Sequence, residues 1–126
     1  GHCPNHKACF EGMACGPAIE ARWGKKCKEL ADNDSVWELE AKYISQALTA
    51  IILILSPQKI ILGGGVMNQK KLFPLIRKNV LEAINEYIST KELRNIESYI
   101  TPSVLNGTQA ILGAFKLAEM ALAEEE

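Results

Sequence analysis

The sequence has little excess charge and no long apolar run, and both shortages narrow the classes of protein it can belong to. Its 14 basic and 15 acidic residues give a formal net charge of -1, without the basic surplus typical of proteins that hold nucleic acid through its phosphates. Its longest apolar run, around residues 50–55, is far shorter than the roughly 20 apolar residues of a membrane-spanning helix. We therefore expect no nucleic-acid partner and no membrane partner, and we expect residues 50–55 to form the buried end of a helix.

A secretory leader is also lacking, because no basic segment followed by an apolar core begins the sequence. We therefore expect a cytoplasmic protein. The sequence has four cysteines, and cysteines in such a compartment are rarely joined in disulfides. Cys15 and Cys27 lie in helix-like sequence, so we interpret them as small buried apolar residues.

Cys3, His6 and Cys9 are spaced three residues apart in a segment with Gly, Pro and Asn and no hydrophobic period. This spacing lets two thiolates and one imidazole converge on one ion from a single loop, and that donor set favours Zn²⁺. His2 adjoins Cys3 and is poorly placed to complete the site. The sequence therefore predicts a structural zinc site whose fourth ligand lies upstream of residue 1. The alternatives are a chance grouping of two thiols and a histidine, and a catalytic zinc with an open position.

Apolar periodicity predicts the elements that follow this loop. Helical spacing is found over residues 17–31, 35–55, 69–88 and 108–123. A capping box of Ser35 and Glu38 is expected to start the second of these helices, and Pro57 to stop it. The last helix is expected to bury its apolar side chains, Ile111, Leu112, Phe115 and Leu117, between a turn at residues 106–107 and a solvated acidic tail at residues 124–126.

Short apolar runs predict two parallel strands, over residues 59–62 and 98–101, joined by the third helix as a βαβ unit. Two parallel strands make a poor sheet on their own, since three or more are usually needed. We therefore expect an α/β chain with several helices and an incomplete sheet, whose missing strands lie upstream.

Two further features are ambiguous on sequence alone. Gly63, Gly64 and Gly65 follow the first predicted strand, and glycines before a helix start let a nucleotide approach the backbone closely. A tight turn that binds nothing explains them equally well. Glu11 follows the last predicted zinc ligand by two residues, and the sequence alone favours a solvated loop glutamate.

Three segments resemble signatures of the bacterial fructokinases of the ROK family. They are residues 1–12 (GHCPNHKACFEG), residues 16–24 (GPAIEARWG) and residues 62–67 (LGGGVM). The resemblance implies an actin-like, ribonuclease-H-like sugar kinase of two lobes, with ATP and sugar in the cleft between them. This chain would be most of the C-terminal lobe, with a zinc loop over residues 1–12 and an α/β nucleotide-binding part over residues 13–126. The N-terminal lobe, with the catalytic aspartate and phosphate loop, is absent, so the chain should not catalyse alone.

The resemblance also implies roles for individual residues. Glu11 would accept hydrogen bonds from sugar hydroxyls, held in direction by the metal-stapled loop. The family's fourth zinc ligand is a histidine upstream of the loop. The wall of the ATP site would be formed by the glycine turn, which is the run of three glycines, by the four residues after it, and by Pro17 on the facing side. The run and the four residues are Gly63, Gly64, Gly65, Val66, Met67, Asn68 and Gln69.

The resemblance implies that the parent protein transfers the terminal phosphate of ATP to a hexose, with fructose the expected sugar and Mg²⁺ neutralising the phosphate charge. Its N-terminal lobe would be the partner of this chain. A homodimer is possible within the family, and the face around Trp23 is a candidate surface. Two other functions stay open, namely a sugar-responsive transcription repressor of the same family and a non-catalytic zinc-stapled domain.

Overall fold

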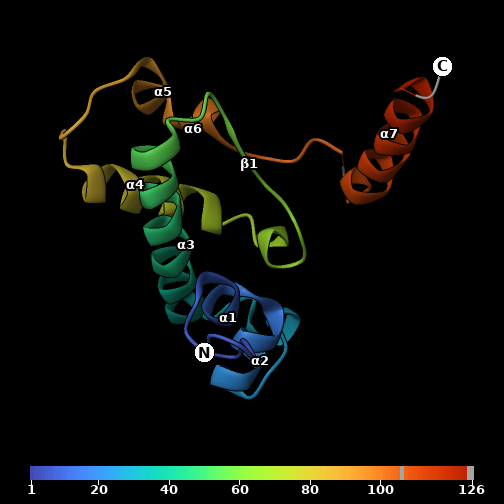
Figure 1. Ribbon diagram of the computed structural model, residues 1–126. Helices are drawn as coiled ribbons and strands as arrows, with labels where there is room; N and C mark the ends of the chain where they lie inside the picture. The colour runs from blue at the N-terminus through green and yellow to red at the C-terminus, as the bar shows by residue number, and fades with distance from the viewer. Residues whose placement is uncertain (106, 125–126) are drawn as a thin grey trace.

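The computed structural model describes residues 1–105 and 107–124, which form an α/β chain dominated by helices (Figure 1). The predicted α/β class is confirmed, although the strands are fewer and shorter than the helices. In chain order the elements are α1 (Phe10–Ala14), α2 (Gly16–Trp23), the 3-10 helix η1 (Cys27–Leu30), α3 (Asp34–Leu55), β1 (Ile60–Leu62), the 3-10 helix η2 (Val66–Asn68), α4 (Leu72–Ile84), α5 (Lys91–Arg94), α6 (Ile96–Tyr99), β2 (Ile100–Pro102) and α7 (Gln109–Glu124).

The two strands pair in parallel, with Ile60 opposite Ile100, and α4 connects them. The predicted βαβ unit is therefore confirmed. The second strand begins two residues later than predicted, because the carbonyl of Asn95 accepts hydrogen bonds from the amides of Ser98 and Tyr99 and holds them in helix α6. Within the described residues the sheet has these two strands.

Helix α3 is the longest described element and contributes many of the buried core residues. It begins at Asp34 with Asn33 as N-cap and ends where Ser56 turns left-handed, with φ 45°. The predicted capping box of Ser35 and Glu38 is wrong. The helix starts one residue before Ser35, so this serine lies inside the first turn and its hydroxyl does not occupy the cap position.

Two predicted helices are shorter than the apolar spacing suggested, because left-handed residues end them. Gly24, with φ 68°, terminates α2, and the chain resumes as η1 instead of continuing to residue 31. Asn85 and Glu86, with φ 44° and 61°, end α4 before residue 88. Left-handed backbone cannot continue a right-handed helix, and neither apolar period showed these breaks.

The core lies mainly between α3 and α4, with η1 closing its lower end. Trp37 is fully buried and its indole nitrogen donates to the carbonyl of Leu30, at 2.9 Å. Facing it and its neighbours on α3 are the buried apolar side chains of α4, namely Leu72, Phe73, Ile76, Val80 and Ile84. Buried residues of β1, η2 and α2 also belong to this core, namely Ile60, Met67 and Ile19.

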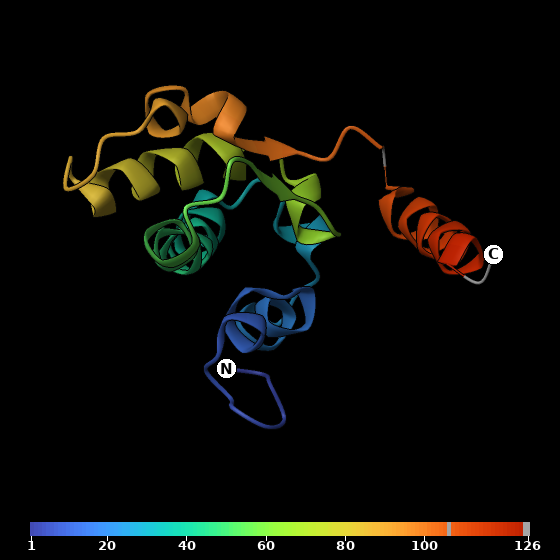
Figure 2. The same ribbon diagram turned by 45° about the horizontal axis from the view of Figure 1, so that its top comes forward.

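The expected burial of two apolar segments is wrong for the described part of the chain. At the end of α3, Ile54 is 78% exposed, and on α7, Phe115 is 67% exposed. Figures 1 and 2 show α7 standing apart from the other helices in both views. Ile61 of β1 is exposed as well, so this strand is covered on one face and not on two. These side chains are uncovered because no described element packs on them.

Parts of two predictions fall outside the described residues. Of the predicted turn, Asn106 lies outside them, whereas Gly107 has a φ of 89°. Of the acidic tail, Glu125 and Glu126 lie outside them. Among the described residues, no helix combines the length and the apolar character of a membrane span.

Candidate functional site

The N-terminal loop folds back on itself before the first helix begins. Cys3 and Lys7 exchange backbone hydrogen bonds of 3.3 and 2.9 Å, and Lys7 takes a left-handed conformation with φ 53°. The amide of His2 donates to the carbonyl of Gly12 at 2.7 Å, which ties the loop to α1. The predicted loop over residues 1–12 is therefore three residues too long, because α1 starts at Phe10.

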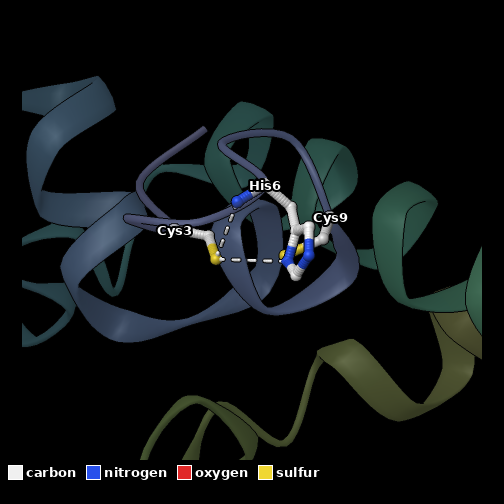
Figure 3. Close-up of side chains that lie close together, drawn as sticks. All are labelled: Cys3, His6 and Cys9. Carbon is white, nitrogen blue, oxygen red and sulfur yellow. Dashed lines mark hydrogen bonds between the residues drawn. The ribbon is translucent and has the colours of Figure 1, made fainter.

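This fold brings the three predicted zinc ligands together. The ligand atoms of Cys3, His6 and Cys9 all lie within 4.8 Å of one another (Figure 3). Cys3 is buried, Cys9 is half-buried and His6 is exposed. The sulfur of Cys3 lies 3.9 Å from Nδ1 of His6 and accepts the His6 amide at 3.5 Å.

The donor set and its spacing fit a zinc ion. Bonds of about 2.0–2.3 Å to a tetrahedral zinc place its ligand atoms roughly 3.3–3.8 Å apart, so a small contraction of the cluster would complete the geometry. Hydrogen bonds from the backbone amides of His6 and Asn5 lower the pKa of the Cys3 thiol, which favours the thiolate that a metal needs. Among the described residues the cluster has these three members and His2 is not one of them.

Glu11 lies in the first turn of α1, two residues after Cys9. Its side chain is exposed, so it can reach a molecule outside this chain. The sequence placed Glu11 in a loop, but the structure places it on a helix whose first residue follows a cluster ligand directly. Its direction is therefore set by α1, and its role in sugar binding stays a prediction.

The glycine turn joins β1 to η2 and borders a cavity of about 320 Å³. Gly64 has a φ of 96°, which side-chain-bearing residues rarely adopt. The helix predicted from residue 69 begins at Leu72 as α4, and a single 3-10 turn, η2, lies between it and the glycine turn. Five of the predicted nucleotide-wall residues line this cavity: Gly63, Gly64, Gly65, Met67 and Asn68.

A second cavity, of about 370 Å³, lies between the glycine turn and the junction of α1 with α2. It is lined by Phe10 and Ala14 of α1, by Gly16 of α2, and by the glycines together with Val66 and Met67. One cavity is thus lined both by α1, which follows the Cys-His-Cys cluster, and by the glycine turn. Pro17 and Gln69 line neither cavity in the described structure, although Pro17 is adjacent to Gly16.

Three polar residues of the first cavity were missed by the sequence reasoning: Lys70, Ser103 and Gln109. The amide of Ser103 donates to the carbonyl of Leu62 at 3.2 Å, which extends the strand pairing by one step. Its hydroxyl donates to Oε1 of Gln109 at 3.4 Å. Ser103 could have been predicted from the sequence, because it follows the second strand and the carboxyl ends of two parallel strands lie at the same edge of a sheet.

Comparison with known proteins gives a consistent set of matches. A model described as the ROK family matches residues 1–121. The chain is 53% identical over 126 residues to the "Putative fructokinase" of Bacillus subtilis (strain 168), covering 99% of this chain and 42% of that protein. It is 41% identical over 121 residues to the "Fructokinase" of Pediococcus pentosaceus, covering 96% and 41% respectively. The chain thus spans about two fifths of the length of these curated relatives.

Proposed function

Because the chain belongs to the ROK family, we propose that it forms part of an ATP-dependent sugar kinase that acts on fructose. The observation that supports this most directly is the cavity shared by α1 and the glycine turn. Direct transfer of a phosphoryl group requires that acceptor and donor be held next to each other. The names of the relatives, which are fructokinases, support fructose as the acceptor.

In this proposal the chain is most of the C-terminal lobe, with residues 1–12 as the zinc loop and residues 13–126 as the nucleotide-binding part. Its partner is the N-terminal lobe of the same protein. Uncovered apolar side chains support such a contact, since Ile54 and Leu55 at the end of α3 and six apolar residues of α7 are exposed. Exposed apolar side chains in such numbers are typical of surfaces that contact another part of a protein.

Cys3, His6 and Cys9 would hold a structural zinc ion, with the fourth ligand supplied from elsewhere in the protein. The ion would cross-link the loop and thereby fix the start of α1, which follows Cys9 directly. Structural zinc contributes folding free energy outright, because its four bonds replace contacts that a short loop cannot make.

Glu11 would be the sugar-binding residue of this chain. An ionised carboxylate accepts hydrogen bonds through two oxygens, so one side chain can bind two neighbouring hydroxyls of a hexose. Its exposure and its place on α1 leave both oxygens available. Because α1 is short and begins at the cluster, a loop fixed by zinc would also fix the position of the Glu11 carboxylate.

The nucleotide would lie against the glycine turn, with residues 63–69 and Pro17 as its wall and Mg²⁺ on its phosphates. The sugar hydroxyl oxygen would form a bond to the terminal phosphorus as the bond from that phosphorus to ADP breaks. The hydroxyl proton would pass to a carboxylate of the N-terminal lobe. Free amides at the turn would stabilise the negative charge of the phosphates.

The experiment is a steady-state assay of the full-length protein with ATP, Mg²⁺ and fructose, mannose or glucose. We expect phosphorylation of fructose with the highest kcat/KM. Absence of ATP-dependent phosphorylation of all three hexoses by a zinc-loaded, folded protein would refute the proposal.

We also propose that the protein acts in the cytoplasm, and a homodimer would be compatible with this function. The face around Trp23 supports a dimer less well than the sequence suggested. Trp23 is half-buried and packs against the core, so it offers limited area to a second subunit.

A further inference from the structure

A fully buried carboxylate lies in the middle of α3. Glu40 has 0% of its surface exposed, and its Oε2 atom lies 3.2 Å from Nη1 of Arg22 on α2. Its other oxygen, Oε1, is buried and has no hydrogen-bond partner among the described residues. A buried carboxylate with a single ion partner is an expensive arrangement for a helix that otherwise buries apolar side chains.

Arg22 contacts more than this carboxylate. Its Nη2 atom donates to the carbonyl oxygen of Met13 at 2.9 Å, and its guanidinium lies 5.1 Å from the ring centre of Tyr43. One side chain from α2 therefore contacts the last turn of α1 and two positions of α3. The planar guanidinium can hold two partners in fixed directions, which a lysine ammonium does less well.

These contacts complete the fixation of α1. On the side of the cluster loop, the amide of His2 donates to the carbonyl of Gly12 in α1, at 2.7 Å. At its end, the carbonyl of Met13 accepts from Arg22. A helix of five residues has too few internal hydrogen bonds to stay fixed by itself. Its two tethers decide where Glu11, in its first turn, points.

We propose that Arg22 and Glu40 are positioning residues for Glu11: Glu40 holds Arg22, and Arg22 holds helix α1 in the orientation that binds sugar. The proposal rests on the proposed function, because it takes Glu11 as the sugar ligand. Neither residue touches sugar in this account. A purely structural role is the competing explanation, since loss of either partner also leaves a buried polar group unpaired.

Four variants of the full-length protein separate these explanations. Arg22→Met removes the tether at the Met13 carbonyl and leaves the Glu40 carboxyl group buried without its partner. The double variant Arg22→Met with Glu40→Met removes that carboxyl group too, so stability should recover while the carbonyl of Met13 stays without its donor. Glu40→Gln keeps an oxygen that can accept from Arg22. Arg77→Met is the matched control, because Arg77 also donates to a backbone carbonyl, that of Ile100 at 2.8 Å, far from α1.

We expect Arg22→Met and the double variant to raise the KM for fructose by about tenfold, with kcat and the KM for ATP within about twofold of wild type. The thermal midpoint should fall in the single variant and recover in the double. Glu40→Gln should keep the fructose KM within about twofold, and Arg77→Met should lower the midpoint without moving the fructose KM. If the fructose KM follows the midpoint back to wild type in the double variant, the positioning role is overturned.

Amide hydrogen exchange of α1 provides a readout that needs no sugar. The Met13 amide should exchange faster in Arg22→Met and in the double variant than in wild type or Arg77→Met. A wild-type protein that neither binds nor phosphorylates fructose would refute the proposed function. Whether Arg22 fixes α1 would then be decided by the amide exchange rates alone. If the Met13 amide exchanges at the wild-type rate in both Arg22 variants, Arg22 does not fix α1, and this conclusion would hold for any result of the kinetic assays.

Discussion

Gly12 packs against Cys3 so closely that a Cβ atom added to Gly12 would lie 2.8 Å from the Cβ atom of Cys3. Real Cβ atoms essentially never approach so near, and the backbone nitrogen of Cys3 would be equally close, at 2.9 Å. The absence of a side chain at this position is therefore what lets α1 lie on the loop that carries the cluster.

We predict that Gly12→Ala pushes α1 away from the loop. The free energy of unfolding should fall by about 2 kcal/mol or more, because the close neighbours are backbone and cannot swing aside. The zinc content should fall with it. Gly16→Ala is the matched control, since a Cβ atom at Gly16 meets nothing within 4 Å. Equal stability of the two variants in urea unfolding would contradict the packing described.

We predict that Cys9→Ala removes the zinc ion. A content of about one zinc per chain, measured by atomic emission on the full-length protein, should drop to near zero because three ligands no longer converge. Cys27→Ala provides the control, because Cys27 lies in η1 away from the cluster and burial raises the pKa of its thiol. Retention of zinc by Cys9→Ala would show that a different set of donors holds the metal.

We predict that Glu11→Gln weakens sugar binding. The amide replaces one acceptor oxygen by a donor, so the KM for fructose should rise by about tenfold to a hundredfold while the KM for ATP changes little. Glu20→Gln is a fair comparison, because Glu20 is an exposed glutamate on the neighbouring helix α2. A fructose KM that stays at the wild-type value would remove Glu11 from the sugar site.

We predict that the two glycines at the end of the turn respond differently to alanine. Gly64 has a φ of 96° and Gly65 a φ of -60°, and a Cβ atom has open space at both. Gly64→Ala should therefore cost about 1 kcal/mol of unfolding free energy through backbone strain alone, whereas Gly65→Ala should be neutral or slightly stabilising. Thermal unfolding of both variants measures the difference, and equal midpoints would mean that the turn has no left-handed residue.

We predict that Glu40 makes stability depend on pH. Burial raises the pKa of Glu40 from its ordinary 4.5 to about 7, and the neighbouring Arg22 opposes this rise. A raised pKa means that the folded state binds the proton more tightly, so the contribution of Glu40 falls as pH rises from about 4.5 to about 7 and is constant above. The change is at most about 3 kcal/mol.

The measurement for Glu40 is urea unfolding at several pH values between 4.5 and 8, for wild type and for Glu40→Gln. The difference between the two curves isolates this residue, because the other titrating groups are common to both. Wild type should lose stability relative to the variant as pH rises through this interval. A difference that does not change with pH would contradict the raised pKa.

The sequence predicted the elements that depend on local patterns. The spacing of Cys3, His6 and Cys9 placed the cluster, and the apolar period placed α3 to within one residue of its start. The family resemblance is confirmed by the match over residues 1–121. These features survive because ligand spacing and helical periodicity are set by neighbours in the chain.

The sequence could not predict features that depend on distant contacts. The need for glycine at position 12 comes from the packing of α1 against Cys3, nine residues earlier in the chain. Arg22 and Glu40 are 18 residues apart, and only the packing of α2 on α3 brings them together. Arg77 of α4 donates to the carbonyls of Glu97 and Ile100, 20 and 23 residues further along the chain. Charged side chains are usually exposed, so their burial is seldom predicted from sequence.

Exposed apolar side chains should make residues 1–126 prone to self-association when they are separated from the rest of the protein. Among the described residues, Ile61 is 63% exposed on a sheet of two strands, and α7 carries further exposed leucine and phenylalanine side chains. A short strand with a free edge and an apolar outer face pairs readily with another copy. Residues 1–126 expressed alone should therefore self-associate with rising concentration and bind hydrophobic dyes, and light scattering over a dilution series would measure this behaviour directly.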